Sequence, residues 1–221
     1  MKNRLAHLVC LAGLMVCAGL VCATPAVAAP EASKIARRWQ LDIEFHDLER
    51  VSVTLPGDNK PTAYWFMLYT VTNNTGEDIE FYPTFDLVTS TLQVIPAGEA
   101  VSPTVYDILR ERYSKLYPFF RDPIRVHGKL LQGEDHARTS VAVFRDFDPK
   151  ADSVTVYIAG LSGEFAKAAN PMFDPKKPES SDNPRFFPLR KTLAVTYDIP
   201  GDEVTRAAST PIRRLREWIM R

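Results

Sequence analysis

Two short acidic clusters contain the residues whose types and spacing could do chemistry. In the first, "GEDH", Glu134, Asp135 and His136 place two carboxylates and an imidazole side by side. Such a trio could bind a ligand, hold a metal ion or exchange protons with a substrate. Turns also attract Asp and Glu, because their side chains make local hydrogen bonds. We therefore name these three as candidate binding residues and assign them no catalytic or metal-binding role.

The second cluster is "DFDPKAD", which offers Asp146, Asp148 and Asp152 as hard oxygen ligands of the kind that calcium takes. It departs from the EF-hand loop, because Lys150 and Ala151 stand where that loop has an acid or amide and then a glycine. We interpret the cluster as a solvated acidic turn and leave irregular calcium ligation open.

Motifs for covalent or cofactor chemistry are missing from the sequence. "GLSGE", residues 160–164, is one residue too short for a nucleophile elbow, and we interpret it as a turn after a strand. The chain has no GxxxxGK[ST] and no GxGxxG, so a phosphate-cradling loop is unsupported. The histidines after residue 28 are His46, His127 and His136, and none lies in an HExxH motif. We expect no cofactor and no metal.

The N-terminus predicts export. A positively charged start precedes an uncharged apolar run over residues 5–21, and Ala26 and Ala28 then occupy the positions that a signal peptidase reads. This pattern predicts a secretory signal peptide over residues 1–28, cleaved after Ala28. A retained anchor is the alternative, but a membrane span needs about 20 apolar residues. We expect a periplasmic or extracellular protein that touches the membrane only through the uncleaved signal.

Cysteine content and charge narrow the class further. All three cysteines, Cys10, Cys17 and Cys22, lie in the predicted signal, so the mature chain must fold without disulfides. Its 193 residues are enough for one domain with its own core. The full chain has 27 basic and 27 acidic residues, and this balance argues against a nucleic-acid partner.

The mature chain is dominated by strand patterns. Residues 39–46 alternate apolar and polar side chains, and Val51, Val53 and Leu55 continue the same parity. "AYWFMLYTVT" is apolar almost throughout, as in a central strand covered on both faces. "NNTGED" follows as a hairpin turn. Further strands are predicted over 79–87, 124–131, 139–144, 154–161 and 189–199. This number of short strands predicts an all-β fold, an antiparallel β-sandwich.

Three segments break or end the strand pattern. Ser102 and Pro103 can cap a short helix over 103–116, with Val105, Ile108, Leu109 and Leu116 on one face. Residues 163–187 are rich in Pro, Asp, Lys and Ser and predict a long surface loop. The C-terminal "TPIRRLREWIMR" is ambiguous between a helix and a final strand. We expect a linker over residues 29–37 and a single domain over residues 38–221.

The stretch "YWFMLYTVTNNTGEDIEFYPTFDLVT" resembles the strand-turn-strand signature of immunoglobulin-like β-sandwich modules in exported bacterial proteins. "KLLQGED", "GLSGE" and "LRKTLAVTYDIPGD" are similar to segments of uncharacterised bacterial secreted proteins. The resemblance implies an immunoglobulin-like sandwich. It implies no activity and brings no catalytic residues.

Aromatic and basic side chains offer a further binding surface. The aromatics around the first hairpin, such as Trp65 and Phe81, could form an exposed platform, but core packing is their commoner use. Arg213, Arg214 and Arg216 form a small basic patch that we interpret as a solvated face.

Two classes of function remain. The first, which we favour, is a non-catalytic module that binds or scaffolds a protein or glycan of the cell envelope. The second is a hydrolase acting on carbohydrate or peptide, with Glu134 and Asp135 as acid and base. Neither the partner nor the oligomeric state follows from the sequence.

Overall fold

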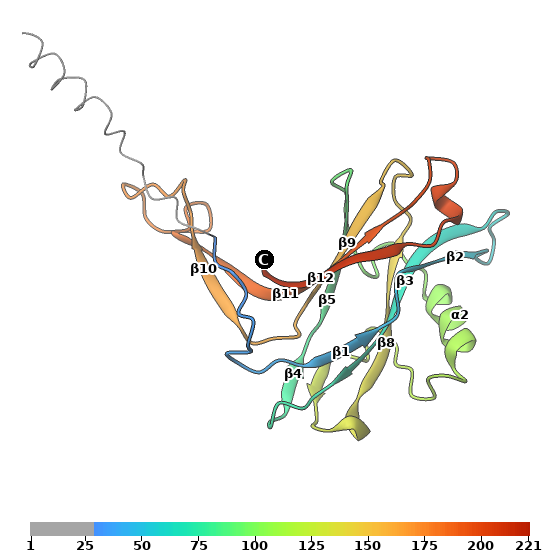
Figure 1. Cartoon of the computed structure of the whole chain (residues 1–221), viewed down its shortest axis with the longest axis horizontal. Coiled ribbons are helices and arrows are strands. Elements are labelled where there is room, and N and C mark those ends of the chain that lie inside the picture. The colour runs from blue at the N-terminus through green and yellow to red at the C-terminus, as the bar shows by residue number, and fades with distance from the viewer. Residues whose placement is uncertain (1–28) are drawn as a thin grey trace, which may run out of the picture.

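The structure is a computed structural model, and it describes residues 29–221. The predicted signal peptide, residues 1–28, lies outside the described residues. Figure 1 shows antiparallel sheets with one short helix on the outside, which confirms the predicted all-β sandwich. The immunoglobulin-like strand order stays a prediction. Among residues 29–221, no helix has the length and apolar character needed to cross a membrane.

The first sheet is built around one long strand, β3 (Thr62–Thr72). β8 (Arg138–Arg145) runs along one side of β3, while β1 (Asp42–Phe45) and β2 (Glu49–Val53) share the other side. β1 and β2 therefore form one edge of this sheet, and β8 forms the other edge.

The prediction that Val51, Val53 and Leu55 continue the parity of the alternation from Trp39 is wrong, because β1 and β2 are offset by one residue. Phe45 pairs with Tyr69 in β1, whereas Glu49 pairs with Phe66 in β2, so the chain between them holds one extra residue. A shift of one residue moves side chains to the opposite face of a sheet. Ile43 therefore faces the core between the sheets, but Val53 faces the opposite side.

The second sheet packs against the first and is built around β11 (Phe186–Asp198). β9 (Ser153–Ala159) and β12 (Ile212–Met220) flank β11, and β5 (Thr84–Thr89) and β6 (Val94–Pro96) follow beyond β9. The ambiguous C-terminal segment is thus a strand, and it forms an edge of this sheet. β4 (Ile79–Phe81) and β7 (Gly128–Leu130) form a separate small pair.

The centre of β3 is buried on both faces, as its apolar run predicts. Trp65 and Met67 face the core between the sheets, whereas Phe66 and Leu68 face the helix α2 (Pro103–Tyr113). The aromatics of the first hairpin therefore belong mainly to the core. Tyr82 is an exception, with 59% of its surface exposed.

The helix begins as predicted but ends early. Ser102 caps it by accepting a hydrogen bond from the Thr104 amide, and Pro103 occupies the first turn. Val105 and Leu109 are buried against the first sheet. Leu116, expected on the same face, lies beyond the helix end and is exposed.

The strand predicted over 124–131 is mostly a turn, and only Gly128–Leu130 pairs as β7. The Asp122 side chain accepts the Ile124 amide at 2.8 Å, and the Asp122 carbonyl accepts the amides of Arg125 and Val126. These local bonds hold the segment in a turn despite its apolar residues.

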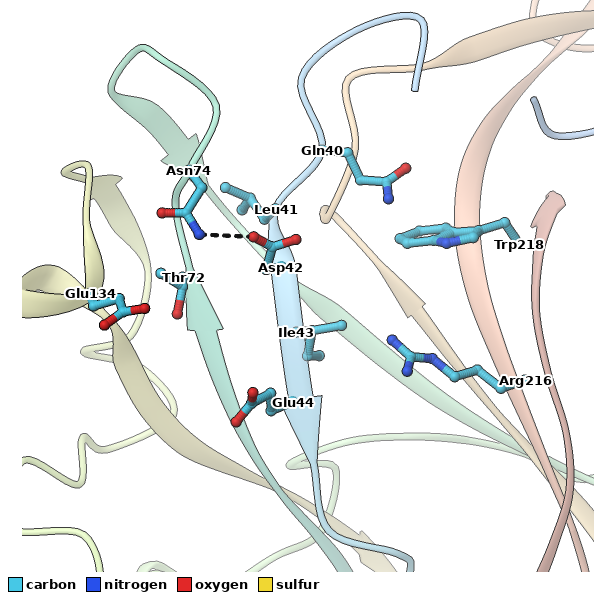
Figure 2. A pocket seen from close by; sticks show the side chains of 10 residues that line it. All are labelled: Gln40, Leu41, Asp42, Ile43, Glu44, Thr72, Asn74, Glu134, Arg216 and Trp218. Carbon is cyan, nitrogen blue, oxygen red and sulfur yellow. Dashed lines mark hydrogen bonds between the residues drawn. The ribbon is translucent and has the colours of Figure 1, made fainter. Parts of the chain in front are cut away.

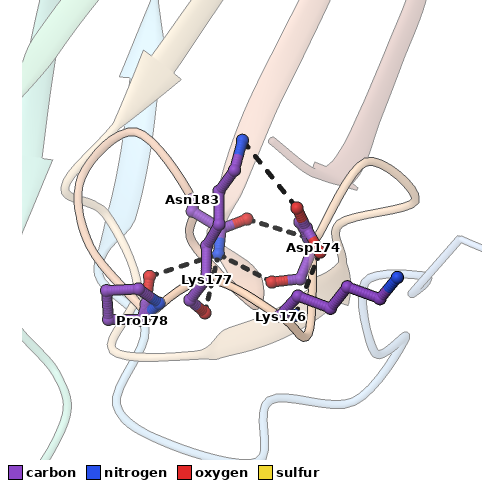
Figure 3. A network of polar contacts seen from close by, with 5 residues as sticks. All are labelled: Asp174, Lys176, Lys177, Pro178 and Asn183. Carbon is purple, nitrogen blue, oxygen red and sulfur yellow. Dashed lines mark hydrogen bonds and ion pairs between the residues drawn. The ribbon is translucent and has the colours of Figure 1, made fainter.

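The predicted surface loop over 163–187 contains a strand that we did not expect. β10 (Phe165–Ala169) pairs with residues 186–190 of β11, and this ribbon projects away from the sandwich (Figure 1). The loop at its tip is organised by Asn183, which is 8% exposed. Asn183 accepts the Asp174 amide and donates to the carbonyls of Asp174, Lys177 and Pro178 (Figure 3).

Candidate functional site

The predicted trio Glu134, Asp135 and His136 forms a short 3-10 turn, η1 (Glu134–His136), at the molecular surface. Two backbone bonds hold this turn, since the Gly133 amide donates to the distant Asn73 carbonyl and the His136 amide donates to the Gly133 carbonyl. Glu134 lines a surface groove, whereas Asp135 and His136 are not among the residues that line it. The structure therefore brings only one of the three candidates to a concave site.

That groove has a volume of about 390 Å³. It lies at the open side of the sandwich, between β1 at the edge of the first sheet and β12 at the edge of the second. Figure 2 shows its side chains on two sides of β1. The acidic and amide side is formed by Asp42, Glu44, Thr72, Asn74 and Glu134. The opposite side is formed by Gln40, Arg216 and Trp218. We call it the edge groove.

β1 presents an unpaired peptide group to the edge groove. The His46 amide donates to the Leu68 carbonyl on β3, so the alternation of an antiparallel pair directs the backbone of Asp42 and Glu44 to β3 as well. Ile43, between them, directs its N–H and C=O away from β3. The Leu41 amide has the same direction and donates to Leu161 at 2.8 Å. The part of the chain that the structure describes places no strand beside Ile43 on that edge.

β12 presents a second free edge to the same groove. Arg190 and Arg221 form a hydrogen-bonded pair in which each amide donates to the carbonyl of the other. Every second residue of β12, counted back from Arg221, therefore directs its N–H and C=O to β11. Arg216 and Trp218 alternate with these, and their N–H and C=O groups point to the open side. Their side chains share the face of Val195 and Leu193, which is the face toward the first sheet.

The two sides of the groove differ in charge. Asp42, Glu44 and Glu134 supply carboxylates on one side, and Arg216 supplies a guanidinium on the other. Asn74 donates to the Asp42 carboxylate at 2.9 Å. The side-chain oxygen of Gln40 is buried and has no hydrogen-bond partner among residues 29–221. An unpaired buried acceptor is costly unless a ligand or water bonds to it.

In the second acidic cluster, Asp146 and Asp148 are engaged in hydrogen bonds, whereas Asp152 is exposed. Asp146 accepts the Trp65 indole N–H at 2.7 Å and pairs with Arg50 at 2.6 Å, and Asp148 accepts the Lys150 amide. Within the described ranges, no three His, Cys, Asp or Glu residues are grouped as a metal site would need. The calcium hypothesis for Asp152 and its neighbours therefore gains no support from the geometry.

A buried polar cluster that the sequence reasoning missed lies beside the groove. The Lys191 ammonium, only 1% exposed, donates to the Ser33 carbonyl at 2.7 Å and pairs with Glu164 at 3.3 Å. The Ser33 amide and hydroxyl both donate to the Glu164 carboxylate. Lys191 also lies 5.3 Å from the centre of the Trp218 ring. These contacts anchor Ser33, within the predicted linker over residues 29–37, to Glu164 and Lys191.

The Ser33 hydroxyl lowers the pKa of Glu164, with smaller contributions from the Ser33 amide and Lys191. Asp152 and Asp202 also have a lowered pKa, chiefly because of hydrogen bonds with the side chains of Ser90 and Thr205. None of these three carboxylates lines the edge groove.

Comparison of the chain with protein-family models, with curated proteins and with solved structures finds no match. The function must therefore be argued from the geometry of the site.

Proposed function

We propose that this chain is an exported, non-catalytic binding module that captures an extended polypeptide segment in the edge groove. The captured segment pairs with β1 as an added strand. Proteins that bind by strand addition gain affinity from backbone hydrogen bonds and specificity from alternate side chains. Export rests on the signal-peptide pattern of residues 1–28.

The observation that carries the proposal is the free peptide group of Ile43 at the floor of a polar groove. Free strand edges pair readily with other chains, so proteins usually shorten, cover or charge them. Here β1 is short, and Arg216 on the opposite wall directs its charged side chain into the groove. The edge is thus protected from indiscriminate pairing but open to a segment of suitable charge.

The charge of the two walls defines that segment. Side chains of an added strand alternate between its two faces. One face would meet the carboxylates of Asp42, Glu44 and Glu134, and it suits Lys or Arg. The other face would meet Arg216 and the Trp218 ring, and it suits Asp, Glu or an aromatic residue. We expect a short segment in which basic residues alternate with acidic or aromatic ones.

The hydrolase hypothesis needs two carboxylates around one reacting bond with their pKa values set apart. Asp135 lies outside the groove, so Glu134 and Asp135 do not form such a pair across it. A specific observation favours strand capture instead, namely the free backbone of β1.

Selection from a peptide library displayed on phage tests the proposal. The mature chain should enrich peptides with basic residues at every second position, and Ile43→Pro should enrich none of them. Proline removes the free N–H of Ile43 without breaking a bond to β3, and proline is tolerated where a strand edge faces solvent. Ile43→Ala is the matched control, because it loses packing but keeps the amide donor. Equal capture by Ile43→Pro and the unmodified chain would contradict the proposal.

A further inference from the structure

A larger cavity lies at the opposite edge of the first sheet, along β8. Its volume is about 550 Å³, within the range of small-molecule sites. The cavity lies between β8, the first turn of α2, the turn after Asp122 and the ends of β5 and β6. It is lined mainly by proline, aromatic and aliphatic side chains, among them Pro83, Phe85, Pro96, Pro103, Tyr106 and Ile124.

One peptide group in the wall of this cavity is buried without a backbone partner. The Gly98 amide donates to the Val143 carbonyl and the Arg121 amide to the Thr139 carbonyl, each at 2.8 Å. Both carbonyls therefore point away from β3. Val141 lies midway between Thr139 and Val143, and β8 pairs with β3 without a register shift. The N–H and C=O of Val141 therefore also point away from β3.

The segments at Gly98 and Arg121 cover the outer edge of β8 on either side of Val141 and leave Val141 itself uncovered. Its N–H and C=O therefore face the cavity, and residues 29–221 supply no backbone partner for either. Val141 is only 1% exposed. Buried peptide groups are nearly always hydrogen-bonded, so a pair of this kind needs a partner such as a water molecule or a bound compound.

The remaining polar groups restrict the charge of that partner. Asp122, Asp86, Thr84 and His127 line the cavity. Arg221 pairs with Asp86 at 3.1 Å. Burial raises the pKa of Tyr106, and the charge of Asp122 raises it further, so the phenol stays a neutral donor. These groups disfavour an anion, and the apolar lining favours a ring over a flexible chain.

We propose that this cavity binds an uncharged, flat ring compound that carries a hydrogen-bond donor and acceptor side by side, as a lactam does. The compound accepts from the Val141 N–H and donates to the Val141 C=O, while its ring packs against Phe85 and the prolines. This site is separate from the edge groove and does not depend on strand capture.

Titration of ¹⁵N-labelled mature protein with quinolin-2(1H)-one tests the proposal. We expect saturable shifts of the Val141 amide and its neighbours in β8. 1-Methylquinolin-2-one has the same ring without the donor and should bind about tenfold more weakly, as expected from one lost hydrogen bond. Equal binding of both compounds, or no saturable shift at Val141, would overturn the proposal.

Two variants separate this site from a structural effect and from the edge groove. Val141→Pro should abolish binding of quinolin-2(1H)-one, whereas Val141→Ala keeps the amide and should retain it. If Val141→Pro does not fold, the comparison of the two quinolinones on the unmodified chain still decides the outcome. Ile43→Pro should bind quinolin-2(1H)-one normally, and loss of binding there would contradict an independent site.

Discussion

The guanidinium of Arg216 lies over the ring of Phe45, with 5.3 Å between its central carbon and the ring centre. This contact joins β12 of the second sheet to β1 of the first, at the open side of the sandwich. Arg213 lies over the same ring at 5.6 Å and pairs with Asp47 at 3.4 Å. Together these contacts bound the edge groove beside Phe45.

The first prediction follows from this wall. Arg216→Ala should weaken capture of the selected peptides about tenfold, because one wall loses its charge. The free energy of unfolding should fall by only about 0.5–1 kcal/mol, the value of an exposed cation–π contact. Arg214→Ala is the control, since Arg214 pairs with Asp198 and does not line the groove. Equal loss of binding in both variants would show that overall charge, not this wall, matters.

The second prediction concerns the core. Trp65→Ala should lower the free energy of unfolding by about 3–5 kcal/mol, because Trp65 is 2% exposed and stacks on Phe147. Tyr82→Ala removes an exposed ring and should cost less than about 1 kcal/mol. Denaturant unfolding measures both. A mild effect of Trp65→Ala would mean that this ring lies outside the core.

The third prediction concerns pH. The lowered pKa of Glu164 means that the unfolded chain binds a proton more readily at this carboxyl. The Ser33–Glu164–Lys191 cluster therefore stabilises the fold fully above the ordinary carboxyl pKa of about 4.3, and this contribution is lost as the pH falls through the lowered value. Glu164→Gln should lose on the order of 3 kcal/mol at pH 7, because Lys191 stays buried without its charge partner.

Unfolding measured from pH 7 to pH 3 checks that prediction. The difference between Glu164→Gln and the unmodified chain should shrink toward pH 3. Asp107→Asn breaks an exposed pair with Arg110 and should change stability by less than about 1 kcal/mol at every pH. A difference for Glu164→Gln that is constant across the range would contradict the role assigned to its charge.

The fourth prediction separates backbone strain from steric clash. Gly76 and Gly160 both have a positive φ, at 95° and 86°. A Cβ on Gly76 would meet nothing within 4 Å, whereas one on Gly160 would lie 2.6 Å from the Tyr82 carbonyl oxygen. Gly76→Ala should therefore cost about 1–2 kcal/mol, the cost of this conformation for a residue with a Cβ. Gly160→Ala should cost clearly more in thermal unfolding, and equal costs would contradict the clash.

The sequence predicted the sandwich because its strands alternate clearly and because β3 is apolar on both faces. It could not predict the face of Val53, because the extra residue between β1 and β2 leaves the apolar spacing intact. The turn after Asp122 was hidden for a similar reason, since apolar residues there pack without forming a strand. The hydrogen bonds that Asp122 accepts from the amides of Ile124, Arg125 and Val126 outweigh the pattern.

The candidate site was less predictable than the fold. Glu134 was named for its chemistry, but the free backbone of Ile43 is set by which strands remain unpaired, and no residue type encodes that. Lys191 did leave a signal, because it shares the alternation of Leu193, Val195 and Tyr197. A charged residue at a core-facing position of a strand predicts a buried partner.

Hydrogen exchange of the Ile43 amide, measured with and without a selected peptide, tests strand capture most directly. We expect this amide to exchange readily in the free protein and to become protected by at least about tenfold when the peptide binds. Asp42 and Glu44, already bonded to β3, should change little. A bound peptide that leaves the exchange of Ile43 unchanged would contradict the account.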